Sequence, residues 1–253
     1  MKKILLIMPY FERPNMVINA LNSFRQIKYD NYEIAIIDDG SVKYPIHNVL
    51  EDFEKIKNVK IYYTNDNIDN KIKRGSIHGK YMNIAIKDSD ADIVVMMSDD
   101  DAVHPDYFIN LNNFYNLNDV KYAYSHIIPF DPYIEIIDEN TIFNLSKKSW
   151  NTRAEINLNK TISLNPYCNV DSTQISWKIE CNKNDGVWFP EEQTKNLDAS
   201  FYNQMYTKYG LCMFTGFYSM YKAFHSDQLG NRNGIEQFQP SDLPKKPNIN
   251  IGE

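Results

Sequence analysis

The sequence predicts an α/β protein with a mostly parallel central sheet flanked by helices. Three observations predict this fold class: short apolar runs of strand length, stretches with helical periodicity between them, and polar turn residues where the runs end. With 253 residues, 43% of them hydrophobic, the chain is long enough to bury the core of one such domain or of two small lobes.

The first hundred residues alternate between expected strands and expected helices. Apolar runs at 2–7, 32–38, 59–64 and 92–98 predict strands. Stretches at 15–27, 45–57 and 78–87 predict helices, the first with its apolar side chains roughly on one face. Strands that alternate with helices in this way pair in parallel, because each helix carries the chain back across a face of the sheet.

The second half is less regular. We expect helices at 105–117 and 198–209, a strand at 120–128 and one or two strands within 211–224. Residues 138–170 are rich in Asn, Ser, Thr and Lys and predict loops. The tail after Asp227 carries three prolines and few apolar residues, which predicts poor order or a segment wrapped over the surface.

Composition speaks against several classes of protein. A formal net charge of −6 and a pI of about 5.4 argue against nucleic-acid binding, which needs a basic surface. Three widely spaced cysteines match neither a disulfide framework nor a zinc motif, and fit a reducing cytoplasm, that of a bacterium or of the host of a virus. The sequence has no run of about 18 apolar residues, so no membrane span is expected. Peripheral membrane association and homodimerisation stay open.

Acidic turns follow two of the expected strands. Residues 99–101 are all Asp and come directly after the run at 92–98, while residues 38–41 read Asp-Asp-Gly-Ser at the end of another run. Ligands of such sheets bind beyond the carboxyl ends of the strands. Three adjacent carboxylates repel one another, and a hard divalent cation would relieve that repulsion. A solvated acidic turn and an ordinary Asp-Gly turn are the alternatives.

Four segments in this order resemble the family 2 glycosyltransferases. They are KILLIMPYFERP at 3–14, NYEIAIIDDGS at 31–41, GKYMNIA at 79–85 and VVMMSDDDAVHPDYF at 94–108. The resemblance covers residues 1–130 and, more loosely, 165–225. It implies the GT-A fold, a Rossmann-like, mostly parallel sheet with a smaller mixed portion on the acceptor side. It also implies a nucleotide-sugar-binding half at 1–105, an acceptor and catalytic half at 106–226, and a tail at 227–253.

The resemblance implies transfer of a sugar from a nucleotide-diphosphate donor to an acceptor hydroxyl, with Mn²⁺ or Mg²⁺ as cofactor. A uridine diphosphate sugar is the favoured donor, and a glycan, glycolipid or glycoprotein is the acceptor. Three acidic residues are assigned to the donor: Asp39 to the nucleotide base, Asp99 to the ribose and Asp100 to the metal ion. The segment that contains Pro9, Tyr10 and Glu12 would line the base pocket.

Basic residues complete the expected donor site. Lys80 and Arg74 lie where a cation would help to bind the pyrophosphate, with a solvated helix face as the alternative. The resemblance also suggests His225, after the last expected strand, as a ligand of the metal or the pyrophosphate. An exposed loop histidine is the alternative there.

The acceptor hydroxyl must lose its proton, and a carboxylate can take it. The segment at 196–202 resembles the one that carries this base, which makes Asp198 the candidate. Leu197 replaces the Glu that usually precedes the base, and Asp198 is also suited to be a helix N-cap. Asp171 and the pair at 191–192, both Glu, are the other candidates for the base. Among the tryptophans, Trp188 is our choice for an acceptor contact.

Two other classes of function are compared with an inverting transferase. A sugar-nucleotide pyrophosphorylase would open with a glycine-rich loop after its first strand, and residues 9–14 contain no glycine. A binding protein that kept the fold but lost catalysis is supported by Leu197 and opposed by the intact Asp99-Asp100 pair. Donor hydrolysis with and without Mn²⁺ separates the transferase from the binding protein.

Overall fold

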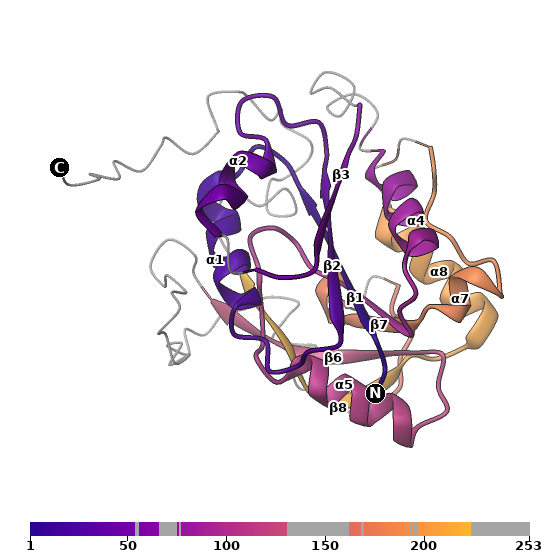
Figure 1. Ribbon diagram of the computed structural model, residues 1–253. Helices are drawn as coiled ribbons and strands as arrows, with labels where there is room; N and C mark the ends of the chain where they lie inside the picture. Colours follow the sequence, from indigo (N-terminus) through magenta and orange to yellow (C-terminus); the bar gives the residue numbers. More distant parts are fainter. Residues whose placement is uncertain are drawn as a thin grey trace.

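The protein is described by a computed structural model, which contains one mixed sheet of eight strands in the described residues (Figure 1). The described residues are 1–53, 56–65, 75, 77–130, 162–167, 170–192, 194 and 197–223. In chain order the strands are β1 (Ile4–Tyr10), β2 (Tyr32–Asp38), β3 (Val59–Tyr63), β4 (Ile93–Met96), β5 (Ala102–Val103), β6 (Tyr122–Phe130), β7 (Ile175–Lys178) and β8 (Met213–Ala223). Across the sheet their order is β3-β2-β1-β4-β7-β6-β8-β5.

The expected mostly parallel sheet is confirmed, and the antiparallel pairs involve strands of the second half or the short β5. Strand β1 pairs in parallel with β2 and with β4, and β2 pairs in parallel with β3. Strand β7 runs antiparallel to both β4 and β6, whereas β8 is parallel to β6 and antiparallel to β5. Because β7 joins β4 to β6, the two halves of the chain share one sheet.

Helices cover both faces of this sheet. They are α1 (Pro14–Phe24), α2 (Ile46–Leu50), α4 (His78–Asp88), α5 (Tyr107–Leu117), α7 (Glu180–Lys183) and α8 (Leu197–Tyr209), with short 3₁₀ helices η1 (Glu51–Phe53) and η2 (Ser172–Gln174). In Figure 1, α1 and α2 lie on one side of the sheet, and α4, α7 and α8 lie on the other.

Strand β1 is apolar throughout because both of its faces are covered. Ile4 and Leu6 belong to the core layer that contains Leu21 of α1 and Leu111 of α5. Leu5 points the other way, into the layer of α4 and α8. Successive side chains of a strand point to opposite faces, so a strand covered on both sides reads as a continuous apolar run.

Several element boundaries differ from the sequence-based expectations. The first helix ends at Phe24, before the expected end at residue 27, and the helix expected at 45–57 is the short α2 followed by η1. The region 211–224 holds a single strand, β8. Strands β5 and β7 were not predicted, because two and four residues are too few to show a period. Most of the expected loop region and the whole tail lie outside the described residues.

The cysteines and the lengths of the helices can be described for part of the chain. Cys181 and Cys212 are buried and free, while Cys168 lies outside the described residues. Among the described helices, none has both the length and the apolar character needed to cross a bilayer.

Candidate functional site

The two acidic turns meet at one edge of the sheet, as predicted from their positions after parallel strands. The backbone N–H of Asp39, just past β2, donates to the carbonyl oxygen of Tyr10 at 2.8 Å. The N–H of Phe11, just past β1, lies 3.4 Å from Asp99 Oδ2 in the turn after β4. The segment that follows β1 therefore touches both acidic turns, because β1 lies between β2 and β4.

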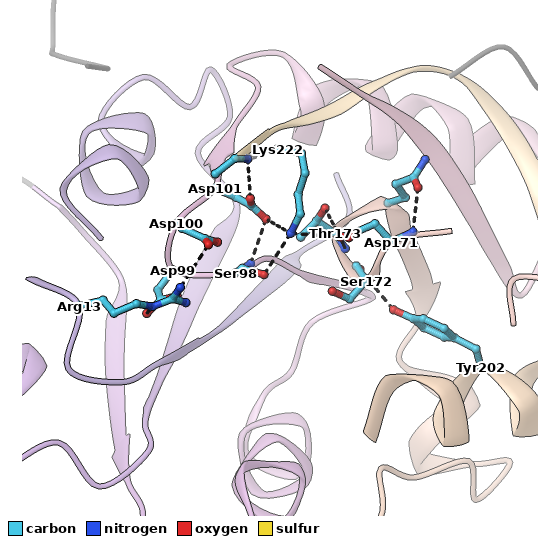
Figure 2. Close-up of polar contacts among 12 residues, drawn as sticks. Arg13, Ser98, Asp99, Asp100, Asp101, Asp171, Ser172, Thr173, Tyr202 and Lys222 are labelled. Carbon is cyan, nitrogen blue, oxygen red and sulfur yellow. Dashed lines mark hydrogen bonds and ion pairs between the residues drawn. The ribbon is translucent and has the colours of Figure 1, made fainter. Parts of the chain in front are cut away.

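Arg13 binds two carboxylates of the turn after β4 (Figure 2). Its Nε lies 3.2 Å from Asp99 Oδ2, and its Nη2 contacts Asp99 Oδ1. Its Nη1 lies 3.2 Å from Asp100 Oδ2. Asp99 and Asp100 are buried, so the planar guanidinium supplies the positive charge that two adjacent buried carboxylates need.

In this cluster, burial and the neighbouring charges shift the pKa of each group in opposite directions. Burial raises the pKa of Asp99 above the ordinary value, and the Coulomb attraction of Arg13 opposes that rise. For Arg13, burial disfavours the charged form, but Asp99 and Asp100 outweigh it and the pKa of Arg13 is raised. The guanidinium is therefore a permanent cation at this site.

Glu12 orders the loop at 41–44. Its carboxylate accepts backbone N–H bonds from Val42, Lys43 and Tyr44 at 2.5, 2.8 and 2.8 Å. Glu12 is 6% exposed and has a positive φ of 50°, which its own backbone N–H bond to Ser41 Oγ helps to hold. The contact of the Glu12 segment with a nucleotide base stays a prediction. The Glu12 carboxylate itself is hydrogen-bonded to the backbone of this loop.

The two carboxylates of the Asp38-Asp39 pair have different partners. Asp38 accepts backbone N–H bonds from Ser41 and Ile46 and so fixes the turn and the start of α2. Asp39 accepts a hydrogen bond from Thr64 Oγ1 at 3.0 Å, and its Oδ2 lies 3.6 Å from His78 Nδ1. Asp39, the residue assigned to the nucleotide base, thus lies between the ends of β2 and β3 and the start of α4.

Lys222 near the end of β8 binds the third carboxylate of the acidic turn. Its Nζ lies 3.1 Å from Asp101 Oδ2, 3.3 Å from Asp171 Oδ1 and 3.4 Å from Ser98 Oγ. Burial lowers the pKa of Lys222, but the Coulomb attraction of Asp101 and Asp171 outweighs it, and the net pKa of Lys222 is raised. Figure 2 shows this ammonium group between the acidic turn and Asp171.

Asp198, the candidate base, lies in the first turn of α8. Its Oδ1 accepts the N–H of Ala199 at 2.8 Å. One turn further on, Tyr202 OH donates to the carbonyl oxygen of Ser172 at 3.3 Å. Burial raises the pKa of Tyr202, and the charges of Asp198 and Asp171 raise it further, so both carboxylates lie within electrostatic reach of its hydroxyl. The structure thus brings the start of α8 to the element that begins with Asp171.

The positions of the other predicted residues say less about their predicted roles. Lys80 is exposed in the first turn of α4, and Pro9 lies in β1 opposite Ile37. Glu191 lies beside Lys87, at 3.7 Å. Arg74 and His225 lie outside the described residues.

The tryptophans have different environments. Trp177 is buried and packs against Phe201, with its Nε1 donating to Asn182 at 2.7 Å, so it belongs to the core. Trp188 is partly buried under Lys87, whose Nζ lies 5.0 Å from the ring centroid. A contact between Trp188 and the acceptor stays a prediction.

The acidic turn offers the donor atoms that a hard divalent cation prefers. In the part of the chain that the structure describes, no group of three or more His, Cys, Asp or Glu side chains is arranged to hold a metal ion. Mg²⁺ and similar ions are commonly held by one or two protein carboxylates together with substrate phosphates. The carboxylates of Asp99 and Asp100 fit that mode of binding, with Arg13 already in contact with both.

Sequence reasoning missed three contributors to this edge of the sheet. Arg13 was part of the quoted segment, and an arginine just before a helix that starts with Pro was a usable signal. Lys222 was the one charged residue in the otherwise uncharged run at 211–224. His78 carries no signal in the sequence, because nothing there brings it to Asp39.

The order of the strands and the position of the acidic turns define the GT-A fold. A family model described as Glycosyl transferase family 2 matches residues 5–230. The chain belongs to glycosyl transferase family 2. Comparison with the curated proteins gives no match.

Solved structures of the same fold are similar over most of this chain. The S. aureus protein TarS 1-349 in complex with UDP-GlcNAc has a TM-score of 0.68 and 14% identity, over 95% of this chain and 63% of that one. The mannosyltransferase PcManGT from Pyrobaculum calidifontis, in complex with GDP-Man and Mn²⁺, has a TM-score of 0.60 and 14% identity, over 89% of this chain and 58% of that one. This chain therefore spans less than two thirds of these structures, and at such identities the likeness establishes the fold alone.

Proposed function

We propose that this chain is an inverting glycosyltransferase that moves a sugar from a nucleotide-diphosphate donor to an acceptor hydroxyl of a glycan, glycolipid or glycoprotein. One observation carries the proposal: in a family 2 chain, two acidic turns meet beside the segment that follows β1. Such an edge suits a nucleoside diphosphate, which needs hydrogen-bond acceptors for its base and ribose and positive charge for its phosphates.

The donor residues take separate roles in this proposal. Asp39 accepts a hydrogen bond from the nucleotide base, and Asp99 accepts one from a ribose hydroxyl. Lys80, exposed on α4, is the proposed cation near the phosphates, and His225 is the proposed further ligand of the metal or the pyrophosphate. We favour a uridine diphosphate sugar, and the UDP-GlcNAc complex of TarS supports that choice. The GDP-Man complex of PcManGT keeps guanosine donors in the test.

Asp100, with Asp99 beside it, would hold the divalent cation. When bound, Mn²⁺ or Mg²⁺ supplies Lewis-acid stabilisation of the charge that develops on the leaving diphosphate. Arg13 keeps the two carboxylates together from the protein side. The segment after β1 and the acidic turn after β4 fix the orientation of the donor, which lowers the entropic cost of reaching the reactive geometry.

Asp198 is the proposed general base. The acceptor oxygen attacks C1 of the sugar from the face opposite the diphosphate, the bond from C1 to the diphosphate oxygen breaks, and the acceptor proton passes to the Asp198 carboxylate. One displacement inverts the configuration at C1. Asp198 lies in the first turn of α8, where a carboxylate interacts favourably with the helix dipole.

A thermal-shift screen of uridine, guanosine and thymidine diphosphate sugars, with and without Mn²⁺, tests the donor site. We expect one donor class to raise Tm, with a larger rise when Mn²⁺ is present, because a ligand that binds only the folded state stabilises it. Asp100→Ala should abolish the Mn²⁺-dependent part. Asp90→Ala, a change at an exposed carboxylate paired with Lys3, is the matched control and should keep it. Equal shifts in wild type and Asp100→Ala would contradict the metal assignment.

A second candidate function is nucleotide-sugar binding without transfer, and Leu197 favours it. Leu197 occupies the position of the usual Glu, is buried, and packs beside Gly79. A carboxylate is therefore missing from the pair that family members carry. Product analysis with the stabilising donor separates the two functions, because a binding protein would shift in Tm but release neither free sugar nor glycosylated acceptor.

A further inference from the structure

Lys222 joins two elements that come from different parts of the chain. Its ammonium contacts Asp101 in the turn after β4 at 3.1 Å and Asp171 at the start of η2 at 3.3 Å. The Lys222 side chain is 9% exposed and that of Asp101 is fully buried, whereas that of Asp171 is 36% exposed. The lysine therefore anchors a partly exposed carboxylate to a buried one.

Each partner of Lys222 is fixed by further bonds. Asp101 accepts the backbone N–H of Ala223 at 3.0 Å, which ties the acidic turn to the end of β8. Asp171 caps η2 by accepting the N–H of Thr173 at 3.1 Å, and its own N–H donates to Gln174 Oε1 at 2.8 Å. A capping box of this kind leaves Asp171 little freedom to move independently of η2.

The η2 element passes this constraint to α8. The carbonyl oxygen of Ser172 accepts a hydrogen bond from Tyr202 OH, one turn beyond Asp198 (Figure 2). The contacts form an unbroken path from the acidic turn through Lys222 and η2 to the helix that carries the proposed base. The backbone ladder between β4 and β7 also joins the two sides, and Lys222 adds a charged contact beyond the end of that ladder.

Burying the ammonium group of a lysine costs desolvation free energy. Its desolvation is offset by hydrogen bonds to Asp101 and Ser98 and by the ion pair with Asp171. An apolar side chain would fill the same space at no electrostatic cost, but it would not fix the positions of two carboxylates. The charge at this point thus supplies geometry that packing cannot.

We propose that Lys222 is a positioning residue for sugar transfer, which sets the separation between the donor-binding acidic turn and the η2–α8 unit that carries Asp198. The inference rests on the proposed function. It requires that loss of the ammonium lowers kcat for transfer while donor binding stays nearly unchanged, because the donor is held by Asp39, Asp99 and Asp100. A misplacement of about 1 Å can cost a factor of about 10² in rate.

Lys222→Met alone leaves Asp101 buried without its counter-ion, so folding must be separated from positioning. The double variant Lys222→Met/Asp101→Asn removes both charges, and the amide oxygen of Asn can still accept the N–H of Ala223. The half-exposed Asp171 is left to solvent. We expect this double variant to keep a wild-type unfolding midpoint and donor affinity within about threefold, but to transfer sugar at least about tenfold more slowly.

Lys222→Arg keeps the charge and should recover part of the lost kcat, which a role in packing alone would not require. Lys121→Met is the matched control: Lys121 precedes β6 and its Nζ lies 2.9 Å from Glu180, an ion pair outside this path. It should leave kcat and the KM for the donor unchanged. The measurements are donor affinity by calorimetry, kcat and KM for transfer, and urea unfolding of every variant.

The outcomes separate the inference from the proposed function. Wild-type kcat in the folded double variant would overturn the positioning role while leaving the transferase standing. A wild-type protein that binds donors but transfers no sugar would overturn both. If the double variant does not fold, Asp171→Asn takes its place, because Asn is also a good N-cap and the change lies at the half-exposed end of the path. It should fold and show the same selective loss of kcat, and an unchanged kcat would again overturn the positioning role.

Discussion

At the scale of single residues, two cations of the chain itself hold the acidic turn together. Arg13 binds Asp99 and Asp100, and Lys222 binds Asp101. All three carboxylates are buried, so each needs a partner whose charge or hydrogen bonds replace the lost hydration. The turn is therefore shaped before any ligand arrives, and removal of Arg13, which binds the two proposed donor-site carboxylates, should change both the stability of the protein and its ligand binding.

Arg13→Gln should leave two buried carboxylates with less compensation. We expect the free energy of unfolding to fall by about 3 kcal/mol, since breaking a buried ion pair costs about 3–5 kcal/mol. Mn²⁺ should restore part of the loss, because a cation bound to the folded state replaces the missing charge. Urea unfolding with and without Mn²⁺ measures both effects. Lys28→Gln, in the exposed pair with Asp106, should change stability by less than about 1 kcal/mol. Equal stability of wild type and Arg13→Gln would refute the argument.

Asp198→Asn tests the general base. The amide keeps the size of the side chain and its preference for a helix start, so folding and donor binding should not change. Turnover should fall by a factor of about 10² or more, because the acceptor hydroxyl loses its proton acceptor. Steady-state transfer kinetics with calorimetric donor binding measure the two effects separately. Asp119→Asn, at a fully exposed carboxylate, is the control. Undiminished turnover would remove Asp198 from the mechanism.

At the scale of elements, α4 and α8 are joined by a close contact that explains the Gly-x-x-x-Asn pattern at 79–83. Asn83 is buried, and its amide donates to the Phe189 carbonyl oxygen at 2.9 Å and accepts the Phe189 N–H at 3.1 Å. A Cβ at Gly79 would overlap with the Pro190 carbonyl oxygen and with Leu197 Cδ1. This motif therefore positions the loop before α8, and with it the start of the helix that carries Asp198.

Gly79→Ala should destabilise the protein although alanine is the better helix former. Helix propensity alone would favour Ala by about 1 kcal/mol, but the overlap with backbone and with Leu197 should reverse the sign and give a net loss of about 1–3 kcal/mol. Transfer should slow as well, because the first turn of α8 must shift. Chemical unfolding and kcat measure these changes, with Asn116→Ala on the exposed face of α5 as a control expected to be neutral or slightly stabilising. A stabilised Gly79→Ala variant would disprove the close approach.

At the scale of the whole molecule, one sheet runs through both functional halves. Strand β4 of the first half pairs with β7 of the second, and β5 pairs with β8. Ile4 of β1 and Met220 of β8 belong to the same core layer, although they lie near opposite ends of the described sequence. The proposed donor and acceptor halves are therefore divisions of function within one cooperative structure.

This continuity predicts a single unfolding transition. Trp150, Trp177 and Trp188 all lie beyond residue 105, so their fluorescence reports the second half, while far-UV circular dichroism reports the whole chain. The two signals should give the same urea midpoint. A fragment that ends at residue 105 should show no cooperative transition, because its β4 edge and both core faces would be uncovered. Two separated transitions in the full chain would show instead that the halves fold independently.

The sequence by itself determined the α/β class, the strands of the first half and the acidic turns at their ends. These features are local: a strand covered on both faces must be apolar throughout, and a turn after it carries its polar residues in consecutive positions. Asp39, Asp99 and Asp100 could be proposed as one site before any coordinates, because the strands they follow were expected in one parallel sheet and the surrounding motifs resemble those of family 2 glycosyltransferases.

Only the tertiary structure decided what surrounds those carboxylates. Lys222, the partner of Asp101, lies 121 residues further along the chain, and Asp171, the second carboxylate on Lys222, lies 70 residues from Asp101. Strand β7, only four residues long, is likewise defined by the β4 and β6 edges that it joins. The physical reason is the same in both cases. A buried charge and a short strand are specified by the partners that satisfy their hydrogen bonds, and the fold brings those partners together from distant parts of the chain.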